Sequence, residues 1–288
     1  MENTVRRKKK SQWIDIWKRF RKNKAAMAGL IIIVILILTA IFADFVAPEG
    51  YDDQNFHRVN QFPSMQHLMG TDNLGRCVFS RVIFGSRISL QVGFIAVSIS
   101  MVLGVAIGAI AGFFGQVLDN ALMRFMDILL SIPQILLAIA IASAIGPGLI
   151  NVMIAVGISS IPGYARLVRA SVLTLREQEF IEAAKACGGS DFRLIVKHIL
   201  PNSLAPIIVQ ATLGLAAAIL SAAALSFIGL GIQPPTPEWG AMLSLGRRFL
   251  RDFWHMSFFP GLAIVVVVLA LNMFGDGLRD ALDPKLKR

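Results

Sequence analysis

Charged side chains are scarce in this sequence of 288 residues. Asp, Glu, Lys and Arg make up 16% of it, whereas about 25% is usual in a soluble domain. Hydrophobic residues make up 55%, and the mean hydropathy is +0.65. A chain of this composition cannot cover itself with polar surface, so a lipid bilayer is its expected solvent. A soluble enzyme and a DNA-binding module are therefore nearly excluded.

The residues that would support catalysis or metal binding are also few. Two cysteines, Cys77 and Cys187, cannot form a disulfide framework or a four-ligand zinc site. The dipeptide Gly-Lys does not occur, which excludes a P-loop ATPase. The four histidines are scattered, with no His-Glu-x-x-His pairing, so a metalloprotease is unsupported. We expect no enzyme activity and no cofactor or metal bound by this chain.

Long windows without charge locate the membrane-spanning segments, because a spanning helix needs about 20 mostly apolar residues. The windows are 25–43, 88–118, 128–165, 198–237 and 253–275. Gly146-Pro147-Gly148 divides the third window into two spans. The six predicted spans are 25–47, 88–113, 121–145, 149–165, 204–231 and 257–275. The apolar stretch of the first is too long for a signal-peptide core, so an uncleaved anchor is expected.

The basic residues predict the orientation of the chain. Of the 28 Lys and Arg, 21 fall on the side that holds both termini and seven on the other. Because basic residues concentrate in cytoplasmic segments, both termini are expected in the cytoplasm. This distribution explains the net charge of +10 without a nucleic-acid partner. Within the N-terminal segment, Trp13, Trp17 and Phe20 recur at helical intervals, which is typical of a helix in the membrane interface.

Ionisable groups are missing from the middle of the predicted spans. Asp44 and Asp276 lie near span ends, and Arg124 and Asp127 are expected to pair near the interface. The deep polar residues are neutral: Gln134, Ser143, Gln210, Ser221 and Asn272. Ion-coupled carriers usually place ionisable groups at depth. A polar solute could pass along these neutral groups, but the energy is expected to come from elsewhere.

Two features point to packing. Gly104, Gly108 and Gly112 recur every fourth residue in the second span, and such spacing lets two helix backbones approach closely. Packing within the chain and a subunit interface are equally compatible with it. Arg76, Arg81 and Arg87 lie on the side that disfavours positive charge. Each of these arginines is therefore expected to have a fixed partner.

The loop 174–202 carries the clearest pattern outside the spans. Residues 174–187 favour a helix with Phe180, Ile181 and Ala184 on one face, and Gly188-Gly189 should stop it in a left-handed C′ conformation. Ser190 should cap a second helix that ends at Pro201, with an apolar stripe of Phe192, Ile195, Val196 and Ile199. The apolar faces of two such helices must be buried against another surface. A groove on a cytoplasmic partner and the lipid surface are both compatible with this pattern.

A family resemblance favours the first alternative. Glu182-Ala183-Ala184, Gly188 and Leu200-Pro201 resemble the EAA motif of bacterial ABC-importer permeases, although His198 stands where an aliphatic residue is usual. Four further stretches resemble the dipeptide/oligopeptide/nickel permeases, and within them the C-type subunit. They are GTDNLGRCVFSRVIFGSRISL (70–90), MRFMDILLSIPQILLAI (123–139), KHILPN (197–202) and LSFIGLGIQPPTPEWGAML (225–243). Cys77 replaces a common Asp in that pattern.

The resemblance implies a complete architecture. It implies an all-α polytopic membrane protein with six transmembrane helices, the type I ABC importer permease fold and both termini cytoplasmic, in the inner membrane of a bacterial cell. The expected segments are a basic amphipathic part (1–24), a first transmembrane helix with an extracytoplasmic loop (25–85), a five-helix permease core (86–276) and a basic tail (277–288).

The resemblance also implies partners and a coupling site. The partners are a second homologous permease, two cytoplasmic ATPase subunits that bind ATP and magnesium, and an extracytoplasmic solute-binding protein. Glu182, Ala183, Ala184, Gly188, Leu200 and Pro201 would form the element that docks into the ATPase. Peptides are the leading expected substrate, with nickel and other solutes left open. An ion-coupled secondary carrier is the alternative, and a membrane scaffold without transport is a third.

Overall fold

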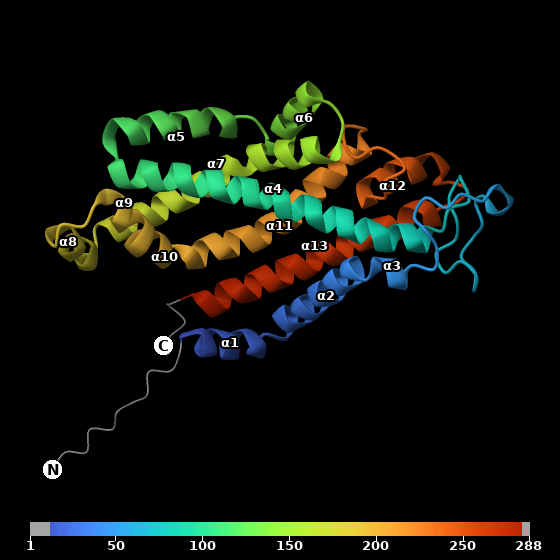
Figure 1. The fold of residues 1–288 in the computed structure, drawn as a ribbon, viewed down its shortest axis with the longest axis horizontal. Helices are drawn as coiled ribbons and strands as arrows, with labels where there is room; N and C mark the ends of the chain where they lie inside the picture. The colour runs from blue at the N-terminus through green and yellow to red at the C-terminus, as the bar shows by residue number, and fades with distance from the viewer. Residues whose placement is uncertain (1–11, 284–288) are drawn as a thin grey trace, which may run out of the picture.

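The computed structural model describes residues 12–283, and α-helices dominate that part of the chain (Figure 1). Five helices are long and apolar enough to cross a membrane. They are α2 (Lys24–Ile41), α4 (Val78–Phe114), α7 (Leu149–Arg176), α11 (Leu204–Phe227) and α13 (His255–Leu282). Two further helices, α5 (Gln116–Leu130) and α6 (Gln134–Ile145), stand where the third of six spans was predicted. The all-helical membrane fold predicted from the sequence is therefore confirmed.

The third span differs from its prediction. The segment 121–145 was expected to be one helix, but α5 and α6 meet at an angle of 89°. The break falls at Ser131-Ile132-Pro133. Pro133 disfavours helical geometry in the residue before it and has no N–H to continue the ladder. The Ser131 N–H closes α5 by donating to the Asp127 carbonyl at 3.0 Å.

Several long helices run beyond their apolar windows. α4 begins at Val78, whereas the predicted span began at residue 88. α7 continues to Arg176, whereas its predicted span ended at residue 165. The first span is shorter than predicted, because α2 ends at Ile41 and a separate turn, α3 (Ala43–Val46), follows. The apolar window thus marks the part of a helix that is apolar enough for lipid, whereas the helix itself also includes its polar ends.

The glycine stripe of α4 is filled by α7. A β-carbon placed on Gly104 would lie 2.4 Å from the Tyr164 Cβ atom, and one on Gly108 would lie 2.4 Å from the Ala165 carbonyl oxygen. Gly112 meets Val172 in the same way, at 2.9 Å. The absence of side chains therefore sets the distance between these two helices. Of the two alternatives left open by the spacing, packing within the chain is the one the structure contains.

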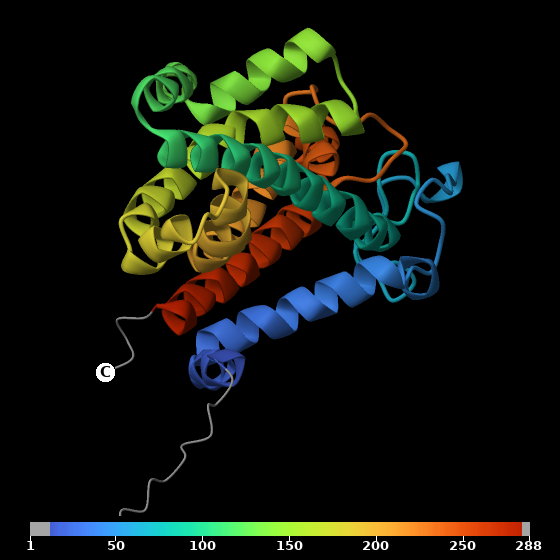
Figure 2. The same cartoon turned by 60° about the vertical axis from the view of Figure 1, so that its left-hand side comes forward.

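α1 (Gln12–Lys22) lies across the start of α2 (Figures 1 and 2). Its Phe20 is buried and packs edge-on against Phe274 of α13, with ring centroids 5.5 Å apart. Trp17 is half exposed, as the prediction of an interfacial helix requires. The side chain of Trp13 and residues 1–11 and 284–288 lie outside the described part.

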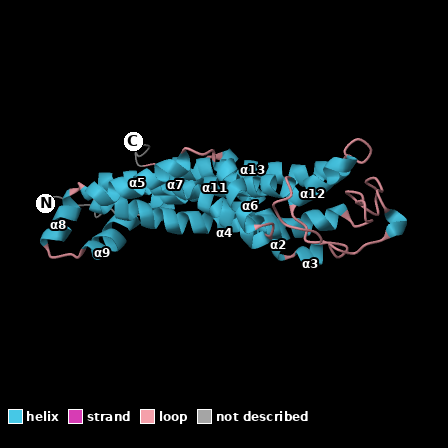
Figure 3. Ribbon diagram, turned by 90° about the horizontal axis from the view of Figure 1, so that it is seen from above, coloured by secondary structure: helices cyan, strands magenta, loops and turns pink. Residues whose placement is uncertain are grey.

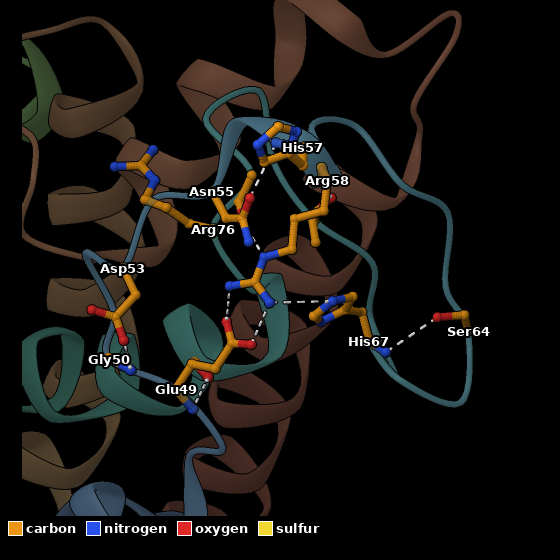
Figure 4. A network of polar contacts seen from close by, with 12 residues as sticks. Glu49, Gly50, Asp53, Asn55, His57, Arg58, Ser64, His67 and Arg76 are labelled. Atoms are coloured by element: carbon orange, nitrogen blue, oxygen red, sulfur yellow. Dashed lines mark hydrogen bonds and ion pairs between the residues drawn. The ribbon is translucent and has the colours of Figure 1, made fainter.

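The opposite end of the molecule carries the long loop 48–77 (Figures 1 and 3). The loop includes the short helix η1 (Phe56–Arg58). The Arg58 guanidinium donates to both carboxylate oxygens of Glu49 at 2.6 and 2.7 Å, and to the Gly75 carbonyl at 3.2 Å (Figure 4). The buried side chain of His67 lies beside it, with its Nε2 3.5 Å from Arg58. A bidentate pair of this kind fixes the loop without regular secondary structure.

The three arginines expected to have fixed partners each have them. Arg76 donates to Asp72 at 2.7 Å, and Arg87 pairs with Asp44 at 3.0 Å. Arg81 donates to the Tyr51 carbonyl at 2.8 Å. These contacts confirm the prediction made from their position.

A second connection at this end contains α12 (Trp239–Gly246) and η3 (Arg247–Phe249). Glu238 caps α12, since its carboxylate accepts from the N–H groups of Gly240 and Ala241, each at 2.8 Å. Burial raises the pKa of the Glu238 carboxyl, and these two donors oppose that rise. Trp239 is fully buried and donates to the Val82 carbonyl at 3.0 Å, which ties α12 to α4.

Candidate functional site

The predicted site lies at one tip of the molecule, at the end opposite the long loop (Figures 1 and 3). It is formed by α8 (Glu179–Ala186), next to the end of α7. The prediction of one helix over 174–187 was wrong. Thr174 belongs to the last turn of α7, and the chain then breaks at Gln178, which has extended backbone geometry. This break lets α8 turn away from the axis of α7 and form a separate element.

Gly188 ends α8 as the sequence predicts. Its φ is +80°, a left-handed conformation that glycine adopts at low cost. The Gly188 N–H donates to the Lys185 carbonyl at 3.0 Å, and the Gly189 N–H donates to the Ala184 carbonyl at 3.1 Å. This pair of bonds is the Schellman motif. It satisfies two carbonyls at the helix end and fixes the direction in which the chain leaves α8.

The second half of the loop differs more from its prediction. It consists of α9 (Asp191–Arg193), a π-helical segment η2 (Leu194–Ile199) and α10 (Leu200–Asn202). Pro201 was expected to end the helix, yet it lies within α10, which leads on to α11 through Ser203. Proline is tolerated in a first helical turn, where its missing N–H costs little. Ser190 stands at the cap position of α9 but makes no side-chain capping bond.

The π segment changes which side chains form the apolar stripe. The prediction named Phe192 and Val196, but these are 77% and 46% exposed. The fully buried side chains are Leu194, which the prediction did not name, and Ile199, which it did. They are five residues apart, which is the hydrogen-bond step of a π-helix. An expectation built on the step of an α-helix therefore identifies Ile199 and the partly buried Ile195, but it misses Leu194 and wrongly includes Phe192 and Val196.

A small apolar cluster fixes α8 to the spans. Ile181 is buried against Val168 and Val172 of α7 and Ile207 of α11. Ile199 belongs to the same cluster, and Leu200 packs against it. The two ends of the loop thus share one contact with the spanning helices. A displacement of α8 would be passed to α7 and α11 through these side chains.

The outward side of α8 is uncovered. Glu182 and Ala183 are exposed, as is Gly188, and Phe180 is 43% exposed. Ala184 is half-buried. A pocket of about 410 Å³ adjoins α8, and its lining includes Arg176, Glu182, Lys185 and Asp191. Of the six predicted coupling residues, four lie on or next to α8, whereas Leu200 and Pro201 lie on α10. Small exposed residues on a well-anchored helix suit close docking of another protein.

A second polar region lies among the spans. Gln134 and Gln210, two of the deep neutral residues noted in the sequence, line one pocket of about 220 Å³. The Gln134 side-chain amide donates to the Ser160 hydroxyl at 2.8 Å, and the Tyr164 hydroxyl donates to the main-chain carbonyl of Gln210 at 3.3 Å. Ser143, Ser221 and Asn272 do not line this pocket. Sequence reasoning missed the contributions of Ser160 and Tyr164 and named Ser143 and Ser221 instead, because the sequence does not show which hydroxyls of an apolar run face the same pocket.

Ion pairs join α5 to α7. The expected pairing of Asp127 with Arg124 is wrong, since the Asp127 carboxylate accepts from Arg166 of α7 at 2.6 Å. Asp119 accepts two bonds from Arg169, at 2.5 and 2.6 Å. In the sequence, the candidate partner of Asp127 was Arg124, three residues away on the same helix. In the structure, Asp127 is instead bonded to Arg166 on the adjacent helix α7. The pairs hold α5 against α7 on one side of the break.

Two family models match the chain. The model described as binding-protein-dependent transport system inner membrane component matches residues 104–288. The model described as the N-terminal TM domain of oligopeptide transport permease C matches residues 11–63.

Among characterised relatives, the dipeptide transport system permease protein DppC of Alkalihalophilus pseudofirmus is 53% identical, over 96% of this chain and 91% of its own. The glutathione transport system permease protein GsiD of Escherichia coli is 47% identical, over 96% and 92%.

Solved structures of the MetNI methionine ABC transporter in inward-facing conformations share the fold. One crystal form gives a TM-score of 0.56 at 20% identity, over 70% of this chain and 96% of that one. Another gives 0.55 at 21% identity, over 71% and 97%.

Proposed function

Because the chain belongs to the binding-protein-dependent inner-membrane components, as a C-type ABC-importer permease, we propose that it carries small peptides across the bacterial cytoplasmic membrane. The membership decides for an importer permease and against the ion-coupled carrier that the sequence left as an alternative. The observation that carries the choice of substrate is the identity of 53% with a dipeptide permease and 47% with a glutathione permease. Both of those cargoes are short peptides.

The proposed complex has four further protein components. A second permease completes the path, two cytoplasmic ATPase subunits bind ATP and magnesium, and an extracytoplasmic binding protein delivers the peptide. This chain contributes no catalytic group in the proposal, since hydrolysis takes place on the ATPases. The sequence supports that division, because it lacks the Gly-Lys step of a P-loop.

In this proposal α8 is the coupling helix. Ala183 and Ala184 permit close approach of the ATPase, Glu182 is the polar contact, and Gly188 sets the bend. The ATPase moves α8, and the cluster around Ile181 passes that motion to α7 and α11. To shift a two-state equilibrium from 1:99 to 99:1 requires about 5.5 kcal/mol of differential binding. A helix anchored in packed side chains can transmit such a difference, whereas one that rests on lipid cannot.

The proposed orientation places α8 and both termini in the cytoplasm. α1, α8 and the end of α13 lie toward one end of the molecule (Figure 1), and most Lys and Arg of the described residues belong to segments on this side. The loop 48–77 and α12 then face outward, where the binding protein docks. This arrangement follows the usual distribution of Lys and Arg.

Reconstitution tests the proposal. The transporter is purified through a tag on this chain, placed in liposomes, and given its binding protein and radiolabelled alanyl-alanine, with ATP on the ATPase side. Uptake should require ATP and the binding protein and persist when a protonophore collapses the ion gradient. Uptake that follows the ion gradient and ignores ATP would contradict the proposal.

A further inference from the structure

The break between α5 and α6 lies at mid-depth among the spans. The pocket beside it is lined by Val97 from the middle of α4, Tyr164 of α7 and Gly214 of α11. Val97 is about 26 to 29 Å from either end of α4 at 1.5 Å per residue. An irregular turn at this depth carries backbone groups that helical bonds do not satisfy.

Lipid cannot cover such a turn. Unsatisfied backbone groups cost several kcal/mol in hydrocarbon, so non-helical backbone occurs at this depth where it is buried in protein or borders water. In this chain Ser131, Ile132, Pro133 and Gln134 are all exposed. The turn is therefore covered by a second protein chain or faces a water-filled passage.

The pocket next to the turn favours the passage. Gln134 at the start of α6 reaches Ser160 of α7, and the Ser160 hydroxyl in turn donates to the Val156 carbonyl at 2.8 Å. One N–H of the Gln134 amide thus holds the side chain in place. Its carbonyl oxygen and its second N–H stay available, because the residue is exposed. No side chain lining this pocket, within residues 12–283, carries a charge.

We propose that Gln134 binds the backbone amide of the transported peptide and that Ser160 positions it. An amide side chain offers both a donor and an acceptor, which is the pattern of a peptide backbone. Peptides share this backbone and differ in their side chains. A neutral site of this kind accepts acidic, basic and uncharged peptides alike. The assignment rests on the proposed peptide transport.

Three substitutions in the complete transporter test the site. Gln134→Met keeps the length of the side chain but removes the amide. Ser160→Ala keeps the Gln134 amide but removes the hydroxyl that holds it in place. Each should raise the KM for alanyl-alanine about five- to tenfold, the effect of one lost hydrogen bond, with the ATPase rate changed less than about twofold. Gln134→Glu should discriminate by charge, with a raised KM for alanyl-glutamate relative to alanyl-lysine. A residue that supports structure alone would not produce this sorting. Unchanged KM values, or an equal effect of Gln134→Glu on both peptides, would overturn the assignment.

Thiol labelling keeps the test valid if these variants fail to assemble. Gln134→Cys is made in a chain with Cys77→Ser and Cys187→Ser, and treated with a membrane-impermeant thiol reagent. Ile35→Cys, on the exposed side of α2 (55% exposed), is the control. Gln134→Cys should react, Ile35→Cys should not, and alanyl-alanine should slow the reaction. Reaction without protection by the peptide would overturn the assignment. If the unaltered transporter takes up no peptide with ATP, the proposed function has failed, whereas the labelling still reports whether water reaches the turn.

Discussion

The backbone at Gly188 offers a direct test of how α8 is coupled to its partner. Its φ of +80° places it in the left-handed region, which costs a residue with a β-carbon about 1–2 kcal/mol. Apart from its two chain neighbours, no atom of residues 12–283 would lie within 4 Å of a β-carbon added there. Gly188→Val should therefore leave folding and membrane insertion intact, while straining the turn that orients α8.

The strain should appear in the docking of the ATPases. If the docked complex requires the observed turn, 1–2 kcal/mol corresponds to a roughly five- to thirtyfold loss of affinity between α8 and the ATPase subunit that it contacts. ATP-driven uptake should fall at least as far. Gly188→Asp adds little strain, because aspartate also visits the left-handed region, but it adds a negative charge at the docking surface and should abolish uptake. Gly188→Asn is the matched control, because asparagine tolerates the left-handed region. Its affinity for the ATPases should fall by no more than about threefold.

The assay is retention of the ATPases on the tagged permease after a timed wash, together with uptake in liposomes. Wild-type retention by Gly188→Val would refute the role of this turn. Equal losses in Gly188→Val and Gly188→Asn would refute the argument from φ and point instead to the size of the side chain.

Three further predictions concern packing and polar contacts. Gly108→Val should lower the thermal stability of the detergent-purified transporter by several degrees, since even a β-carbon meets the backbone of α7 at 2.4 Å. Gly163→Ala should match or exceed the wild type, because beyond its own helical turn no atom of the described residues would lie within 4 Å of the added β-carbon. Asp119→Asn should lower the stability of the folded transporter by about 1–2 kcal/mol in the same assay. Asp127→Asn, in the more exposed ion pair, should lower it by less than about 1 kcal/mol. Equal losses of stability in the two variants would contradict the argument from burial. Arg58→Lys loses the bidentate contact with Glu49, so proteolysis of the loop 48–77 on the outer side of intact vesicles should be faster. An unchanged cleavage rate would show that this ion pair does not hold the loop.

The sequence predicts the parts of this fold that depend on local chemistry. The absence of charge locates the spans, the glycine after α8 marks its end, and the disfavoured position of Arg76, Arg81 and Arg87 indicates that they are paired. The sharp bend at Pro133 is not evident, because hydropathy averages over a turn of three residues. Mean hydropathy is the same for a straight helix and for a bent pair.

Two further features of the structure differ from the sequence analysis. In the π segment Leu194 is buried while Phe192 and Val196 are exposed, and nothing in the local pattern signals the change from the α-helical step. Asp127 pairs with Arg166 across helices, because α7 packs beside α5 and supplies a nearer cation. The pairing of Asp127 depends on a contact between helices far apart in the sequence, which periodicity does not reveal.

The most direct test of the central claim is the composition of the native complex. A tag on this chain, mild detergent and mass spectrometry with protein standards should recover a second, different permease and two copies of ATPase subunits for each copy of this chain. The ATPases should be lost, with the second permease retained, when Glu182 and Gly188 are substituted together. Recovery of the chain alone, or as a homo-oligomer without ATPases, would contradict the assignment of α8 as the coupling helix of an ATP-driven importer.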